Sequence, residues 1–321
     1  MSFPKPAEFE TLASVASHLR DAKCVQLAAF AILIYDHALT FPLEVERIWK
    51  QKVTGPAILF LLNRYVTPLQ YIVIITAFHL PTWTGKACDD FVMFEGALSA
   101  VMSNVCEVIM ILRVYALYGR SNKILAFLGL LWLLQLVISL KGVSTGVAVQ
   151  LPPFPPFVGC ILTGPNNWFS VVWVGPLVTD TAIFVLMLWR IRRYIRSTES
   201  IPLLHIFVRD GLIYFLVIFL MNFMNALLFF LAPEDLKPIG APFSAMMTAV
   251  MISRLVLNLR SAKSAGVDLV PSNMLTRPKE SIAFESAVSR VIGNLGEDFE
   301  MSKTTSSAHE WRPRPRSSSP V

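Results

Sequence analysis

The chain has 321 residues, of which 54% are hydrophobic and 16% are charged, with a formal net charge of +6. Soluble domains carry about 25% charged residues, so this composition favours a membrane protein over two soluble domains. One or two long apolar runs would fit the buried core helices of a large soluble helical protein, but this chain has seven.

Seven apolar stretches are long enough, or nearly so, to cross roughly 30 Å of hydrocarbon as helices. None alternates with period 2, which argues against a membrane β-barrel. We predict an all-α fold, a seven-helix transmembrane bundle over residues 24–260, with tails at residues 1–23 and 261–321. The predicted crossings are Cys24–Leu43, Pro56–Leu80, Phe91–Leu112, Ile124–Leu140, Trp168–Trp189, Leu212–Leu231 and Ile239–Val256.

Lysine and arginine gather after the first, third, fifth and seventh predicted helices. The positive-inside rule then places the N-terminus outside and the C-terminus in the cytoplasm. We expect the plasma membrane, and another endomembrane is the alternative. The basic excess is therefore a topology signal, and we expect no nucleic-acid partner. Examples from the four basic segments are Arg47, Lys50, Arg113, Arg120, Lys123, Arg190, Arg192, Arg193, Arg254 and Arg260.

The segment after the first helix, residues 44–52, mixes charges with a tryptophan. We predict a juxtamembrane anchor in which Ile48 and Trp49 enter the membrane interface and Lys50 faces anionic headgroups. An ordinary anchoring turn is the simpler alternative.

Three charged residues inside the predicted helices lie at a similar depth: Asp36, Arg64 and Glu107. At about 1.5 Å per residue, all three lie about 8–12 Å from the cytoplasmic boundary. A buried charge needs a partner, so we expect Asp36 to pair with Arg64. Such a pair is either a static staple between helices, which we favour, or a polar lock that shifts between conformations.

Further polar residues share helix faces. Asn104 lies one turn before Glu107, Asn222 one turn before Asn225, and Asp180 near the middle of the fifth predicted helix. These side chains either line an internal polar cavity or link helices by hydrogen bonds, and we favour the helix links.

Two of the four cysteines, Cys88 and Cys160, lie on the predicted outer side. Disulfides persist in oxidising compartments, so we predict a Cys88–Cys160 bridge that pins the loop before the fifth helix over the bundle. Cys24 is the competing partner, and Cys106 is expected to be packed inside a helix.

No catalytic or metal-binding motif is visible: the chain has no HExxH, and its five histidines are scattered. We therefore expect no enzyme activity, no metal and no cofactor. The polar C-terminal tail, residues 261–321, is expected to be largely disordered, with one amphipathic stretch at residues 281–295.

Three spaced blocks carry a family resemblance: YDHALT at residues 35–40, EVE and IWK within residues 44–50, and LFLLNRY at residues 59–65. They resemble the N-terminal signature of a fungal membrane family, domain of unknown function 6533, which is abundant in basidiomycetes. The resemblance covers residues 24–70. It implies a seven-helix membrane protein with no assigned activity, and it marks Asp36, Trp49, Arg64 and Tyr65 as signature positions.

The predicted topology also resembles that of G-protein-coupled receptors in helix count, orientation and cystine. Two motifs of the rhodopsin-like receptors are missing, because Leu112 stands where an acid would precede Arg113, and the last helix lacks Asn-Pro-x-x-Tyr. Our leading hypothesis is a receptor-like sensor in the lipid bilayer, with a cytoplasmic signalling partner at the basic inner loops and an unspecified ligand. The alternatives are a channel or transporter with an intramembrane polar path and a non-catalytic membrane scaffold.

Overall fold

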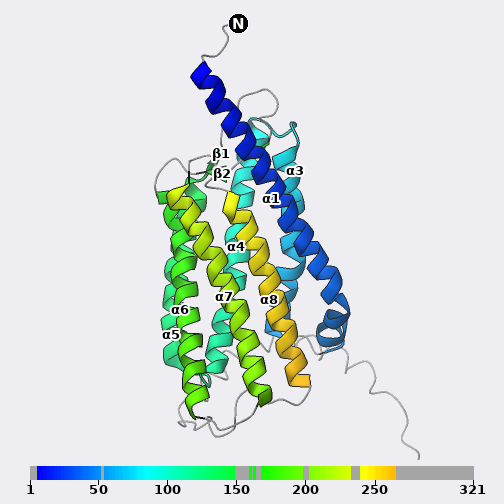
Figure 1. Ribbon diagram of the computed structural model, residues 1–321, viewed down its shortest axis with the longest axis vertical. Helices are drawn as coiled ribbons and strands as arrows, with labels where there is room; N and C mark the ends of the chain where they lie inside the picture. The colour runs from blue at the N-terminus through cyan, green and yellow to red at the C-terminus, as the bar shows by residue number, and fades with distance from the viewer. Residues whose placement is uncertain are drawn as a thin grey trace, which may run out of the picture.

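The computed structural model describes residues 6–51, 54–148, 159–160, 162–163, 168–197, 202–232 and 239–264. It is a bundle of long helices with one short hairpin at one end (Figure 1). The elements are α1 (Pro6–Glu44), η1 (Val45–Trp49), α2 (Gly55–Leu61), η2 (Leu62–Val66), α3 (Thr67–His79), α4 (Lys86–Leu117), α5 (Asn122–Thr145), β1 (Val147–Ala148), β2 (Leu162–Thr163), α6 (Trp168–Ser197), α7 (Pro202–Leu231) and α8 (Gly240–Ser264).

Within these described residues, seven helical spans are long and apolar enough to cross a membrane, which confirms the predicted number. They are Ala13–Trp49, Gly55–His79, Lys86–Leu117, Asn122–Thr145, Val174–Arg193, Gly211–Leu231 and Gly240–Ser261. Large apolar side chains cover the outer surface; Leu69, Val137 and Leu140 are each more than 60% exposed. Such a surface suits lipid tails, and the chain is an integral, multi-pass membrane protein.

Most helices are longer than the predicted crossings; α6 continues to Ser197 and α7 begins at Pro202, instead of ending at Trp189 and beginning at Leu212. The first helix begins at Pro6 rather than Cys24, and Figure 1 shows its first turns extending beyond the other helices. Residues 7–23 contain alanine, glutamate and leucine without an internal proline or glycine, so they continue the helix although they are not an apolar run. The last helix continues to Ser264.

The bundle is closed by contacts between helices that are distant in sequence. Successive helices from α4 to α8 pack side by side, and α8 packs against α1, which in turn contacts α3. Helix α4 is central, because it contacts α3, α5, α6 and α8.

Two apolar cores divide the bundle along its length. One contains Leu33, Ile74, Phe91 and Met246 and lies beside the Cys88–Cys160 bridge; we call this part the disulfide half. The other is larger and contains, among others, Phe60, Ile109, Val114, Leu128, Ile183, Phe215, Ile252 and Leu255; we call it the opposite half.

The predicted Cys88–Cys160 disulfide is confirmed, with 5.6 Å between the Cα atoms, and Cys24 is exposed and free. Gly159, at φ +110°, lets the chain pass so close to α3 that the Cys160 N–H donates to the Ala77 carbonyl at 3.2 Å. The β1–β2 hairpin lies next to the bridge, and both close the end of the disulfide half.

Candidate functional site: an ion-pair cluster and a polar cavity

A buried ion pair lies where α1 meets η2. Arg64 Nε is 2.6 Å from Glu44 Oε2, and both side chains are almost fully buried. Arg64 Nη2 also donates to the His37 carbonyl and to Thr40 Oγ1, each at 2.8 Å. The guanidinium therefore has partners from two turns of α1, as a buried charge requires.

Two aromatic side chains complete the environment of Glu44. Tyr65 Oη and Trp49 Nε1 donate to Glu44 Oε1 at 2.8 and 3.0 Å. The indole body of Trp49 is exposed, and Lys50 is exposed beside it. Ile48, in contrast, is buried in the core of the opposite half, so its predicted place in the membrane interface is wrong. We call Glu44, Arg64, Tyr65, Trp49 and Thr40 the ion-pair cluster.

The expected pair between Asp36 and Arg64 is wrong. Asp36 instead accepts a hydrogen bond from Arg254 of α8, and Arg64 takes Glu44. Because α1 continues through Glu44 into η1, Glu44 is available to Arg64, and Asp36 lies two turns away, at the α1–α8 contact.

The π-helical segment η2 begins at Leu62, six residues before Pro68. Pro68 has no N–H to donate to the carbonyl of Arg64, so the regular hydrogen-bond ladder is interrupted here, and widened turns of this kind often mark functional sites. Asn63 of η2 donates to the Ala249 carbonyl at 3.0 Å and to Ser253 Oγ at 3.2 Å, and accepts from the Cys106 thiol at 3.2 Å. Neighbouring residues of η2 thus bond in different directions: Asn63 to α4 and α8, and Arg64 to α1.

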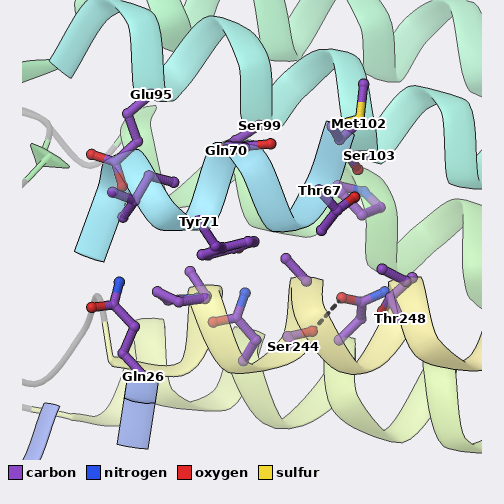
Figure 2. Close-up of a pocket in the computed structure, with 18 of the residues that line it drawn as sticks. Gln26, Thr67, Gln70, Tyr71, Glu95, Ser99, Met102, Ser103, Ser244 and Thr248 are labelled. Carbon is purple, nitrogen blue, oxygen red and sulfur yellow. Dashed lines mark hydrogen bonds between the residues drawn. The ribbon is translucent and has the colours of Figure 1, made fainter. Parts of the chain in front are cut away.

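A cavity of about 210 Å³ occupies the disulfide half, and Asn63 and Thr67 contribute to its wall. Side chains from α1, α3, α4, α6, α7 and α8 line it, together with Cys160 and Leu162 from the closing loop. Figure 2 shows polar side chains of four of these helices around one space: Gln26, Thr67, Gln70, Tyr71, Glu95, Ser99, Ser103, Ser244 and Thr248.

Two chains of hydrogen bonds reach this cavity. Gln135 donates to Glu107 and accepts from Thr179 (2.7 Å), which joins α4, α5 and α6. Asn222 donates to Asp180 (2.5 Å), and Ser244 donates to Asn222 (2.8 Å), which joins α6, α7 and α8.

The two interpretations of these polar residues, helix links and cavity lining, therefore hold together. Glu107, Asp180, Asn222 and Asn225 all line the cavity, and the first three also bond to neighbouring helices. Asn104 is buried but donates to the Ala100 carbonyl of its own helix at 2.7 Å and does not line the cavity. Glu107 has no contact with the Asp36 and Arg64 pairs, so the three charges do not form one group.

Several important residues escaped the prediction: Glu44, Asn63, Gln135 and Arg254. The spacing of Asp36, Thr40 and Glu44, four residues apart, places them on one helix face and was a usable signal. Arg254 was counted only as a basic residue of the inner side. Residues 265–321, including the proposed amphipathic stretch, lie outside the described residues.

Among the described residues, no group of three or more histidine, cysteine or acidic side chains could hold a metal ion. A search of curated proteins found no match to this chain. The model of a family of unknown function, DUF6533, matches residues 24–69.

The matched region contains the buried ion pair between Glu44 and Arg64 and the residues that bond to it. It holds Asp36, His37, Thr40 and the complete Glu44–Arg64 pair with Trp49 and Tyr65, as well as Asn63 of η2. The ion-pair cluster is thus a feature of the matched region itself, whereas most of the cavity wall comes from later helices. Over residues 24–69, the chain is similar to the family of unknown function DUF6533.

Proposed function

We propose that the protein is a receptor-like sensor, non-catalytic, in which a ligand in the cavity shifts η2 and α8 and the opposite half reports the shift. The observation that carries the proposal is the position of η2. Asn63 of this segment lines the cavity and bonds to α8, while Arg64 holds the buried pair with Glu44. A change at the cavity wall is therefore one residue away from the ion-pair cluster.

The two ends of the bundle support an orientation with the disulfide half outside and the opposite half in the cytoplasm of the plasma membrane. A disulfide persists on the oxidising side, and the opposite half presents exposed Arg120, Arg192 and Arg193. These arginines would face a cytoplasmic signalling partner or anionic headgroups.

A channel or transporter is the second candidate, favoured by the polar chains that end at Glu107 and Asp180. Against it, the wall of the cavity merges at Cys106 and Met110 with the large apolar core of the opposite half. No polar path continues from there among the described residues of that core, which is the arrangement of a closed site rather than of a pore.

The test is to fill the cavity with a larger side chain and to measure a distance between two helical segments in the opposite half. Thr248→Phe places a ring in the cavity, and Ser103→Phe does so from α4. Spin labels on Lys50→Cys and Arg192→Cys, both exposed, would report the distance between η1 and α6 in a Cys24→Ser background. Thr181→Phe, the same change of size at an exposed position on α6, is the control.

A sensor predicts a changed distance distribution with either cavity variant and none with Thr181→Phe. A transporter instead predicts substrate or ion flux in proteoliposomes that is lost with Asp180→Asn. An unchanged distance in both cavity variants, with the disulfide formed and the protein monodisperse, would overturn the sensor proposal.

A further inference from the structure

The charged residues that line the cavity are all acidic. Among them are three acids, Glu95, Glu107 and Asp180, and no lysine, arginine or histidine. Glu107 and Asp180 are 2% and 3% exposed, so neither charge is solvated by bulk water. Each carboxyl uses one oxygen for a neighbouring amide, from Gln135 or Asn222.

The second observation concerns unused hydrogen-bonding capacity. Seven buried side-chain atoms of the lining residues have no partner, and all seven are oxygens: Gln26 Oε1, Thr67 Oγ1, Gln70 Oε1, Glu107 Oε2, Asp180 Oδ1, Asn225 Oδ1 and Thr248 Oγ1. Five of them belong to carboxyl or amide groups. The amide oxygens can accept but not donate hydrogen bonds, and the same holds for the carboxyl oxygens when they are ionised. Buried acceptors without donors are costly, so the lining favours an occupant that donates hydrogen bonds.

The volume of the cavity and the polarity of its wall limit the class of ligand further. A volume of about 210 Å³ holds roughly seven waters at about 30 Å³ each. It is below the roughly 300–1,000 Å³ of pockets for drug-sized ligands. The wall also has an apolar part, which includes Ile74, Phe78, Met102, Met110 and Phe229. A bare metal ion suits this wall poorly, because no three acidic, histidine or cysteine side chains of the described residues converge.

We infer that the cavity binds a small organic cation, an ammonium group on a short apolar body, with the head held by Asp180 and Glu107. The ammonium supplies N–H donors to the unpartnered oxygens and a positive charge to the carboxylates. The apolar body fills the remaining wall. This ligand class deepens the proposed sensor function and rests on the same cavity.

The test uses matched probes on the full chain in lipid nanodiscs. Two sets share one body each: 2-phenylethylammonium, 2-phenylethanol and phenylacetate, and butylammonium, 1-butanol and butanoate. For each probe, the rise of the unfolding temperature is measured against concentration, with sodium chloride at equal ionic strength. We expect the ammonium of at least one set to act at about one-tenth or less of the alcohol concentration, and the carboxylate to have no effect.

The variants assign the effect to the cavity. Asp180→Asn and Glu107→Gln keep side-chain volume and should each weaken the ammonium probe about tenfold or more, without changing the response to the alcohol. Glu46→Gln, at an exposed acid, should behave as wild type. Equal action of ammonium and alcohol on the wild type, an equal effect of sodium, or an unchanged ammonium response in both variants would overturn the inference.

The failure of this inference and that of the sensor proposal have different signatures. Ammonium binding without a change between the labels at positions 50 and 192 leaves the ligand class standing and removes the sensor. A change of that distance in the cavity-filling variants without ammonium preference does the reverse.

Discussion

The disulfide half and the opposite half hold their helices together by different means. The disulfide half has a covalent bridge and a closing hairpin around a cavity with unpartnered oxygens. The opposite half has a dense apolar core with the buried Glu44–Arg64 pair at its edge. The disulfide half thus has space for a ligand, whereas the opposite half is closely packed. Segment η2 contributes to both, because Asn63 lines the cavity and Arg64 pairs with Glu44.

The largest effect is expected at the buried pair. Arg64→Met or Glu44→Gln leaves one partner without its counter-charge, so unfolding should become easier by about 3–5 kcal/mol. The pair Glu44→Leu with Arg64→Met should recover much of that loss, because no uncompensated charge stays buried. Unfolding in mixed micelles measures both. Asp21→Asn, in an exposed ion pair with Arg20, is the control and should change little.

The bridge of the disulfide half should come next. Cys88→Ala with Cys160→Ala removes a cross-link between residues 72 positions apart and should cost about 2–4 kcal/mol. Hydrogen exchange should rise around α3 and the start of α4 and stay unchanged in the core of the opposite half. Equal loosening of both halves would show that they are not separate units. Cys24→Ser, at the free exposed cysteine, is the control.

A single methyl group tests the closing loop. A Cβ at Gly159 would lie 2.2 Å from the Phe78 carbonyl oxygen, at a positive φ that side chains disfavour. Gly159→Ala should therefore cost about 1–3 kcal/mol and slow formation of the bridge, which non-reducing electrophoresis measures. Gly129→Ala meets no atom within 4 Å and should be tolerated; normal bridge formation in Gly159→Ala would contradict the close approach.

The smallest effect is expected at Asp36. Its partner Arg254 is 39% exposed, so solvent screens the pair, and Asp36→Asn should cost only about 1–2 kcal/mol. A loss as large as that of Glu44→Gln would mean that Asp36, not Glu44, is the main anchor of α1 in the opposite half.

The number of helices and the disulfide followed from the sequence because each depends on a local or coarse feature: apolar length in one case, and cysteines on one side in the other. The Asp36–Arg64 pair did not follow. Depth along a helix axis was estimated well enough to bring Arg64 near α1, but rotation about the axis and the extent of the first helix decide which carboxylate it meets. Ending that helix at Leu43 removed Glu44 from consideration.

Only some of the residues that line the cavity could be predicted, for a similar reason. Asp180, Asn222 and Asn225 stand out as polar residues in apolar helices. Gln70, Ser99 and Ser244 do not, because small or neutral polar residues are common in membrane helices and only tertiary packing decides which of them meet. The π-helical turn of η2 also escaped, because a proline at position 68 does not by itself predict a widened turn.

The measurement that would decide the matter is a double-mutant cycle between the two halves. Thr248→Phe fills the cavity and Glu44→Gln breaks the buried pair, and unfolding free energies are measured for each variant and for both together. If η2 couples the halves, the interaction free energy should exceed about 0.5 kcal/mol, whereas the control cycle of Thr181→Phe with Glu44→Gln should be additive. Additivity in both cycles would contradict the coupling and leave the cavity and the ion-pair cluster as independent features of one bundle.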